Sequence, residues 1–170
     1  TKALVVGDPA KPETQLGPMV SAGQRASVEE FLADARARGS QFACGGARPH
    51  PTGYYLEPTV LLDVGMADRC WREEIFGPVL AVTPFDTEED ALRMANGTEY
   101  GLAAAVWTSN LSRAHRMVRA IDAGVVHVNT YGGADNTVPL GGHRQSGNGH
   151  DKSLHALDKY VNLKTAWIQM

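Results

Sequence analysis

The chain has 170 residues and a formal net charge of −3 at pH 7, with 43% hydrophobic and 21% charged residues. This length allows one domain with a sizeable core, and the negative balance argues against a nucleic-acid-binding surface. No apolar run is long enough to cross a bilayer, and two cysteines are too few for a disulfide framework, which favours the reduced cytoplasm.

The first half of the chain carries one clear helix signal. Apolar residues recur at helical spacing after Ser21, Gln24 stands in the position of a capping box, and Gly39 ends the pattern. The predicted inner face consists of Val28, Phe31, Leu32 and Ala35. The same criteria predict extended segments over residues 41–44, 54–62 and 79–85. Because Pro58 interrupts the second of these, we expect it at a sheet edge.

Strands and helices alternate in the second half. Asp86 begins a predicted helix, with Glu89 in the box position, and Gly97 ends it. A second helix, over residues 110–121, would turn five residues inward, namely Leu111, Ala114, Met117, Val118 and Ile121. The remaining predictions are strands over 102–108, 125–129 and 161–168, a long loop over 130–148 and a short helix over 151–159. This alternation predicts an α/β fold with a parallel sheet and right-handed crossovers.

The stretch 73–79 combines two carboxylates, an aliphatic residue, an aromatic ring and a Gly-Pro corner. Pro78 disfavours the helical region for Gly77, so the chain leaves this turn extended. At the mouth of a strand, Glu74 can accept hydrogen bonds from paired sugar hydroxyls, and Phe76 can form a wall for a flat ring. The alternative from spacing alone is an exposed glutamate pair and a phenylalanine of the core.

Other motifs of catalytic chemistry are incomplete. The run 147–152 is similar to a dinucleotide fingerprint, but Lys152 occupies the third glycine position and a loop precedes the run. The six histidines show no ligand spacing, so no metal site is predicted. Cys44 lies in an apolar context typical of an inert thiol. Arg72 could in principle lower the pKa of Cys70, but neither cysteine is predicted to be a catalytic nucleophile.

The stretch 73–79 resembles the cofactor-side signature of the NAD(P)-dependent aldehyde dehydrogenases. Further stretches resemble the same family, in family order: residues 6–9, 16–20, 100–104, 124–129 and 139–147. The resemblance covers essentially the whole chain but only the C-terminal third of such an enzyme. It implies the parallel-sheet part of the catalytic domain over residues 1–159 and a C-terminal oligomerisation strand over residues 160–170.

The resemblance also implies a reaction. In the family a cysteine thiolate attacks the aldehyde, a hydride passes to the nicotinamide, and a glutamate activates the water that hydrolyses the thioester. That cysteine and that glutamate lie upstream of Thr1, so these 170 residues alone are expected to be inactive. By motif match Glu74 binds the nicotinamide ribose, Phe76 lies beside it, and Gln24 makes a polar contact with the cofactor. The cofactor is NAD or NADP, because the residues that select between them lie in the upstream domain.

The loop from residue 130 to 140 corresponds to the family's substrate mouth. Ala134 and Leu140 stand where acetaldehyde-type members carry aromatic residues, and Asp135 adds a carboxylate that can pair with an ammonium or an amide. With residues 145–157, this loop looks most like the γ-glutamyl-γ-aminobutyraldehyde dehydrogenase branch of putrescine breakdown. This resemblance implies that the substrate is an aminoaldehyde or an acylated aminoaldehyde. The alternative for Asp135 is a turn residue that faces water.

The terminal strand is implied to pair with the sheet of a neighbouring subunit in a homo-oligomer. Two positions depart from many members of the family: His150 replaces an arginine, and Asn162 replaces a glutamate in the last strand. Their joint replacement removes an ion pair without leaving one charge unpaired.

Two other functions stay open. A short non-catalytic protein would use the last strand as an oligomerisation or interaction module. An independent small-molecule binder would use Glu74 and Phe76 with half of the cofactor site missing. The abrupt start of the chain inside a family motif favours the C-terminal part of an aldehyde dehydrogenase over both.

Overall fold

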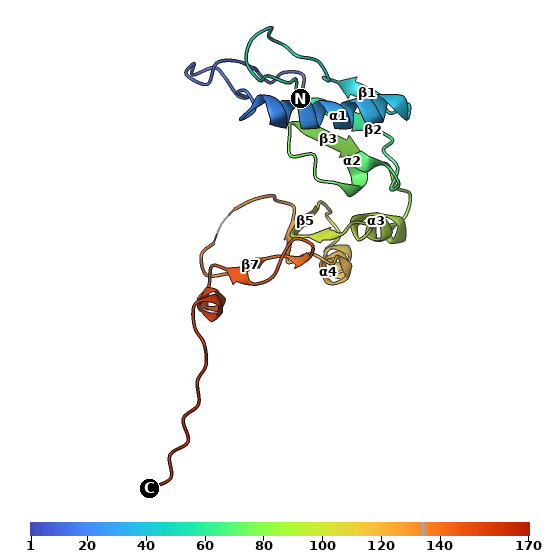
Figure 1. Ribbon diagram of the computed structural model, residues 1–170. Coiled ribbons are helices and arrows are strands. Elements are labelled where there is room, and N and C mark those ends of the chain that lie inside the picture. The colour runs from blue at the N-terminus through green and yellow to red at the C-terminus, as the bar shows by residue number, and fades with distance from the viewer. Residues whose placement is uncertain (134) are drawn as a thin grey trace. The chain divides into compact units, whose positions relative to one another are not determined.

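The computed structural model describes residues 1–133 and 135–170 (Figure 1). They form two compact units, residues 1–86 and residues 87–170. Both units mix helices with short strands and contain parallel strand pairs, as the predicted α/β class requires. In the described part of the chain, no helix has the length and apolar character to cross a membrane.

The first unit is a helix packed on a three-stranded sheet (Figure 1). Its elements are α1 (Ala22–Ala37), β1 (Gln41–Cys44), β2 (Thr59–Leu62), α2 (Arg69–Arg72) and β3 (Val79–Val82). The sheet order is β1-β2-β3, with β1 antiparallel and β3 parallel to β2. One apolar cluster fills the space between these elements, made of Val28, Phe31, Leu32, Ala35, Leu56, Leu61, Val64, Cys70 and Ile75.

Helix α1 follows its sequence signals closely. The Ser21 side chain accepts a hydrogen bond from the Gln24 N–H at 3.1 Å, which caps the helix as predicted. The Gln24 side chain does not complete the predicted capping box, because it contacts Phe76. All four residues predicted to face inward are buried. Gly39 follows the helix with φ +84°, a conformation that glycine adopts at little cost.

The predicted edge position of the second strand is wrong, because β2 lies in the centre of its sheet. Pro58 directly precedes the strand, so the missing proline N–H removes no bond from the ladder. The Thr59 N–H donates to the Pro78 carbonyl at 2.8 Å and starts the pairing with β3. Because β1 runs antiparallel, the sheet is mixed and not wholly parallel.

The second unit is built around a strand–helix–strand crossover. β5 (Ala103–Val106), α4 (Leu111–Ala120) and β6 (Val125–Val128) form it, and the two strands pair in parallel. α3 (Glu88–Ala95) precedes them. Two small antiparallel pairs complete the unit, β4 (Tyr100–Gly101) with β8 (His143–Arg144) and β7 (Leu140–Gly141) with β9 (His150–Asp151). The 3₁₀-helix η1 (Leu154–Lys159) follows.

The sequence signals are less accurate in this unit. Thr87, not Asp86, caps α3, because its side chain accepts from the Asp90 N–H at 3.0 Å. On α4, Ala114 and Met117 are buried as predicted, but Leu111 is 72% exposed. The predicted loop 130–148 contains β7, which pairs with the nearby β9, and β8, whose partner β4 lies far away in sequence. Two-residue strands carry too little periodicity to be recognised.

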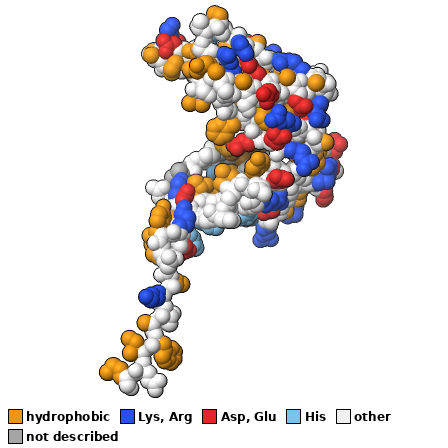
Figure 2. Space-filling model, viewed as in Figure 1, with side chains coloured by type: hydrophobic (Ala, Val, Ile, Leu, Met, Phe, Trp, Pro, Cys, Tyr) orange, Lys and Arg blue, Asp and Glu red, His pale blue; other side chains and the backbone are white. Residues whose placement is uncertain are grey.

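Residues 161–170 form no strand with the described part of the chain. They extend away from η1, and hydrophobic side chains stand along this segment (Figures 1 and 2). The most exposed are Leu163, Trp167, Ile168 and Met170. Strand pairing with another subunit stays a prediction.

Candidate functional site

The turn Glu73–Pro78 connects α2 to β3 and holds its side chains in an alternating arrangement. Ile75 is buried in the core cluster, while Glu74 and Phe76 on either side of it are exposed. Phe76 is 74% exposed and has φ +51°. Few residues other than glycine adopt this left-handed conformation, and a bulky one needs surrounding contacts to keep it. The turn therefore presents an aromatic ring outside the core. The alternative prediction, that Phe76 belongs to the core, is wrong.

The two glutamates of the turn differ in what they contact. Glu73 accepts a hydrogen bond from Arg69 Nε at 2.9 Å, one helical turn back, and this bond raises the pKa of Arg69. Glu74 has no hydrogen-bond or ion-pair partner among the described residues. A solvated carboxylate without a protein partner keeps both oxygens available for a ligand. The i,i+4 spacing of Arg69 and Glu73 is the sequence signal for this pair.

Gln24 and Phe76 are brought together by the fold. Gln24 lies in the first turn of α1, and its side-chain Nε2 donates to the Phe76 carbonyl oxygen at 2.7 Å. The next residue of the turn, Gly77, packs against the same helix, since an added Cβ would lie 2.6 Å from Val28 Cγ2. Three residues predicted to contact the cofactor thus belong to one turn and the helix that supports it.

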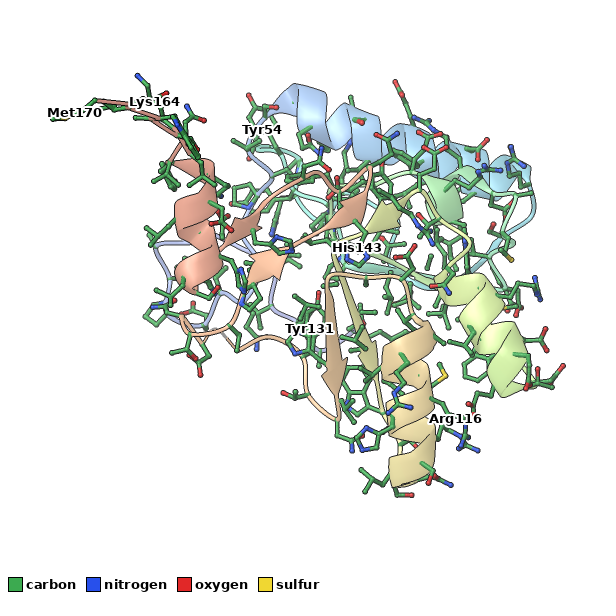
Figure 3. The ribbon with its side chains drawn as sticks, turned by 90° about the horizontal axis from the view of Figure 1, so that it is seen from below. Tyr54, Arg116, Tyr131, His143, Lys164 and Met170 are labelled. Atoms are coloured by element: carbon green, nitrogen blue, oxygen red, sulfur yellow. The ribbon has the colours of Figure 1, made fainter. Side chains whose placement is uncertain are left out.

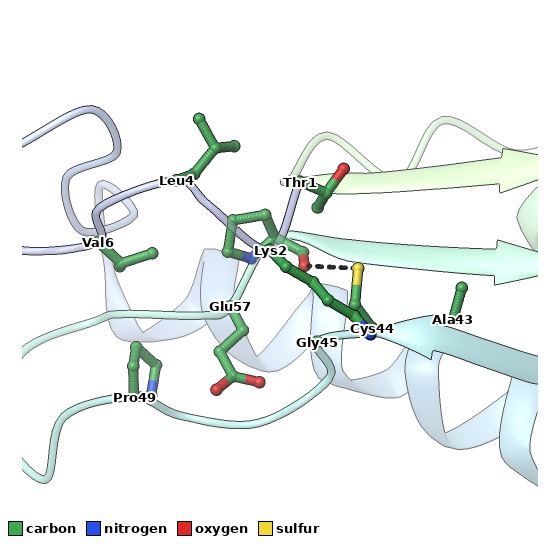
Figure 4. Close-up of a pocket in the computed structure, with 10 residues that line it drawn as sticks. Thr1, Lys2, Leu4, Val6, Ala43, Cys44, Gly45, Pro49 and Glu57 are labelled. Carbon is green, nitrogen blue, oxygen red and sulfur yellow. Dashed lines mark hydrogen bonds between the residues drawn. The ribbon is translucent and has the colours of Figure 1, made fainter.

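The two cysteines lie in different environments, Cys70 buried and Cys44 half-buried. Burial raises the pKa of the Cys70 thiol, which keeps it protonated near neutral pH. Cys44 Sγ is directed at the Pro58 carbonyl oxygen, 3.8 Å away (Figure 4). Beside it lies a cavity of about 470 Å³, lined also by Thr1, Lys2 and Glu57. None of the residues predicted to bind cofactor or substrate lines this cavity.

The predicted substrate residues belong to the second unit. Asp135 Oδ1 accepts from the Thr137 N–H at 2.8 Å and from the Thr137 hydroxyl at 2.7 Å, and these bonds lower the pKa of Asp135. One carboxylate oxygen therefore shapes the loop itself, as the turn alternative proposes. Leu140 begins β7 and pairs with Asp151 in β9. Ala134 lies outside the described residues.

A polar network holds the C-terminal side of the loop 130–148. Asp122 accepts from Arg144 Nε at 2.6 Å and pairs with His143 Nδ1 at 2.7 Å, and the two contacts lower its pKa. Arg144 Nη1 donates to the carbonyl oxygens of Asn96 and Thr98 at 2.9 and 2.6 Å. Figure 3 shows His143 in the second unit and Arg116 on α4. This network was not predicted from the sequence, because its members are 21 to 48 residues apart and share no local motif.

The comparison with known proteins identifies the class. The sequence profile of the aldehyde dehydrogenase family matches residues 1–166, and the chain belongs to that family. The predicted family is confirmed. The chain spans about a third of the length of the curated relatives it matches.

Particular relatives agree with this assignment. The NADP/NAD-dependent aldehyde dehydrogenase PuuC of Escherichia coli is 48% identical over 96% of this chain and 33% of its own length. A betaine aldehyde dehydrogenase of Sinorhizobium fredii is 44% identical over 100% of this chain and 36% of its own. Among solved structures, a mutant of the P. syringae indole-3-acetaldehyde dehydrogenase AldA in complex with NAD+ and IAA has a TM-score of 0.94. It is 48% identical over 99% of this chain and 34% of its own.

Proposed function

We propose that these residues form the nicotinamide side of an NAD(P)-dependent aldehyde dehydrogenase, which oxidises an aldehyde to a carboxylate. The observation that carries the proposal is the turn Glu73–Pro78, in which Glu74 has no partner among the described residues and Phe76 stands outside the core. A free carboxylate beside an exposed ring fits a ribose with an attached aromatic base. The NAD+ bound in related solved structures supports this choice of ligand.

When bound, NAD(P) would supply the hydride acceptor for the oxidation, and the residues of this chain would hold and orient it. Glu74 accepts hydrogen bonds from the vicinal hydroxyls of the nicotinamide ribose. Phe76 limits how far the ring can move. Fixing the acceptor over the reacting carbon lowers the entropic part of the barrier.

The nucleophile is proposed to lie outside these residues. Cys70 is buried with a raised pKa, and Cys44 is directed at a backbone carbonyl away from the turn. A thiolate nucleophile is accessible and has a lowered pKa, whereas the Cys70 thiol is buried and its pKa is raised. The 170 residues by themselves are therefore expected to be inactive.

An aminoaldehyde or acylated aminoaldehyde is the proposed substrate. The similarity to PuuC and to betaine aldehyde dehydrogenases supports it, although an indole-3-acetaldehyde dehydrogenase is equally similar in sequence. Asp135 retains one oxygen, Oδ2, for an ammonium or amide group of the substrate, because both recorded contacts with Thr137 use Oδ1.

The domain assignment of residues 1–159 and 160–170 is part of the proposal. The exposed hydrophobic side chains after Tyr160 support an oligomerisation strand that pairs with another subunit. The same segment supports the second candidate, a non-catalytic protein that joins subunits through this strand.

Removal of the Glu74 carboxylate tests the proposal in the native protein that carries this sequence. We expect Glu74→Ala to raise the dissociation constant for NAD(H) about 10- to 100-fold, because hydrogen bonds to a charged group contribute about 1.5–3 kcal/mol. NADH fluorescence titration would measure the dissociation constant, and steady-state kinetics with a γ-glutamyl aminoaldehyde would measure the effect on turnover.

Glu73→Ala is the matched control, since Glu73 is adjacent and paired with Arg69. It should change cofactor affinity little. Equal effects of the two substitutions would contradict the assignment of Glu74. A native mass of 18.3 kDa with no NADH binding would favour the non-catalytic candidate.

A further inference from the structure

The conformation of Phe76 needs a physical cause. Its φ of +51° lies in the left-handed region, which an exposed phenylalanine does not adopt by its own preference. The ring is 74% exposed, so ring packing does not hold it there. The contacts that fix this conformation must act on the backbone.

Contacts at Phe76 and at its two neighbours hold the backbone of the turn. Ile75 is buried before Phe76, and Gly77 packs on Val28 after it, so both flanks are fixed to the core. The bond from Gln24 Nε2 at 2.7 Å is the one that reaches the carbonyl of Phe76 itself. Because that carbonyl belongs to the peptide plane between Phe76 and Gly77, the bond fixes ψ of Phe76 directly.

The donor is itself well supported. Gln24 is half-buried on a helix that starts at a capped Ser21 and buries Val28 and Phe31. Its neighbour Arg25 donates to the Gly53 carbonyl at 2.8 Å. The acceptor also determines the orientation of the amide, since a carbonyl oxygen requires the nitrogen of the side chain to face it.

We infer that Gln24 is a positioning residue, which sets the direction of Phe76 and Glu74 toward the cofactor through the Phe76 carbonyl. This inference rests on the proposed function of the turn. It differs from the polar cofactor contact expected for Gln24 from the family, because the group that matters is the N–H donor and not the amide oxygen. Loss of the bond would release the strained peptide and let both side chains turn away, while the fold stays intact.

The test uses three substitutions in the native protein. Gln24→Met removes the hydrogen bond at similar size, Gln24→Lys keeps a donor and loses the oxygen, and Gln24→Glu keeps an oxygen and loses the donor. Gln41→Met is the control, since Gln41 is exposed on β1. Amide exchange over residues 73–79 is measured without cofactor, and NADH affinity is measured at about 0.5 M salt to screen the added charges.

We expect Gln24→Met and Gln24→Glu to accelerate exchange in the turn and to weaken NADH binding about 5- to 10-fold, the effect of roughly one hydrogen bond. Gln24→Lys should restore both properties, and Gln41→Met should change neither. A direct contact through the oxygen predicts the reverse order, with Gln24→Glu tight and Gln24→Lys weak, and would overturn the inference.

Other outcomes are equally decisive. Unchanged exchange in Gln24→Met would show that the bond does not hold the turn, and faster exchange with full affinity would show that the position of the turn is irrelevant to the cofactor. If the unsubstituted protein binds no NADH, the proposed function fails. The exchange data would then still show whether Gln24 holds the turn, as a structural contact only.

Discussion

The two units stabilise their candidate functional residues in different ways. In the first unit, the turn Glu73–Pro78 is attached to a continuous apolar core through Ile75 and Gly77. In the second, only Ala114, Met117 and Ile121 are buried among the hydrophobic residues described, and polar contacts do most of the joining. Glu88 accepts from Arg113 and Arg116, and Asp122 from Arg144, across 22 to 28 residues.

This difference has a physical consequence. Apolar burial involves no titrating group and is not screened by ions, whereas exposed ion pairs weaken with added salt and are lost when one partner titrates. The proposed cofactor turn should therefore keep its geometry over a wide range of conditions. The proposed substrate loop should respond to pH and to single charge changes.

The largest expected effect comes from the apolar core of the first unit. Leu61 is 0% exposed in the central strand, so Leu61→Ala should lower the free energy of unfolding by about 2–5 kcal/mol through lost burial and a cavity. Urea denaturation of the native protein would measure the change. Val20→Ala, at a side chain 88% exposed, is the control and should cost less than about 0.5 kcal/mol. Similar losses for both would contradict a core in this unit.

A smaller and local effect is expected at Asp122. Asp122→Asn removes the charge that holds His143 and Arg144, so amides of residues 143–147 should exchange faster while those of β1 to β3 do not change. Exchange detected by mass spectrometry would show this. Asp158→Asn is the matched control, because Asp158 has no recorded partner in the described part of the chain. Loosening that spreads to the first unit would remove the distinction between the units.

The smallest effect is a pH dependence from the same carboxylate. His143 and Arg144 hold the pKa of Asp122 below its ordinary value of 3.8. The folded state therefore binds this proton more weakly than the unfolded state, so the contribution to stability is complete above the ordinary value. It is lost as pH falls through the lowered pKa of the folded protein. The difference in thermal midpoint between wild type and Asp122→Asn should shrink on acidification, and a constant difference would argue against this linkage.

Local signals predicted the parts of the site that depend on neighbouring residues. The Ser21 cap, the buried face of α1 and the extended exit at Pro78 follow from contacts within a few positions. The family was evident from short motifs in order, and the sequence profile confirmed it. Glu74 and Phe76 were singled out by the same motif, and their roles stay predictions.

The rest of the site depends on the tertiary structure. The bond between Gln24 and Phe76 joins residues 52 positions apart, and the Asp122 network joins segments 21 or more apart. The central position of β2 and the pairing of β7 with β9 also depend on contacts between strands and not on the residues within each strand. Sequence by itself determined where α1 begins and which of its faces is buried, because these depend on local sterics and periodicity, and its motifs indicated the family. Only the tertiary structure decided which carbonyl Gln24 holds and which carboxylate holds Arg144, because such partners are chosen by the packing of distant segments.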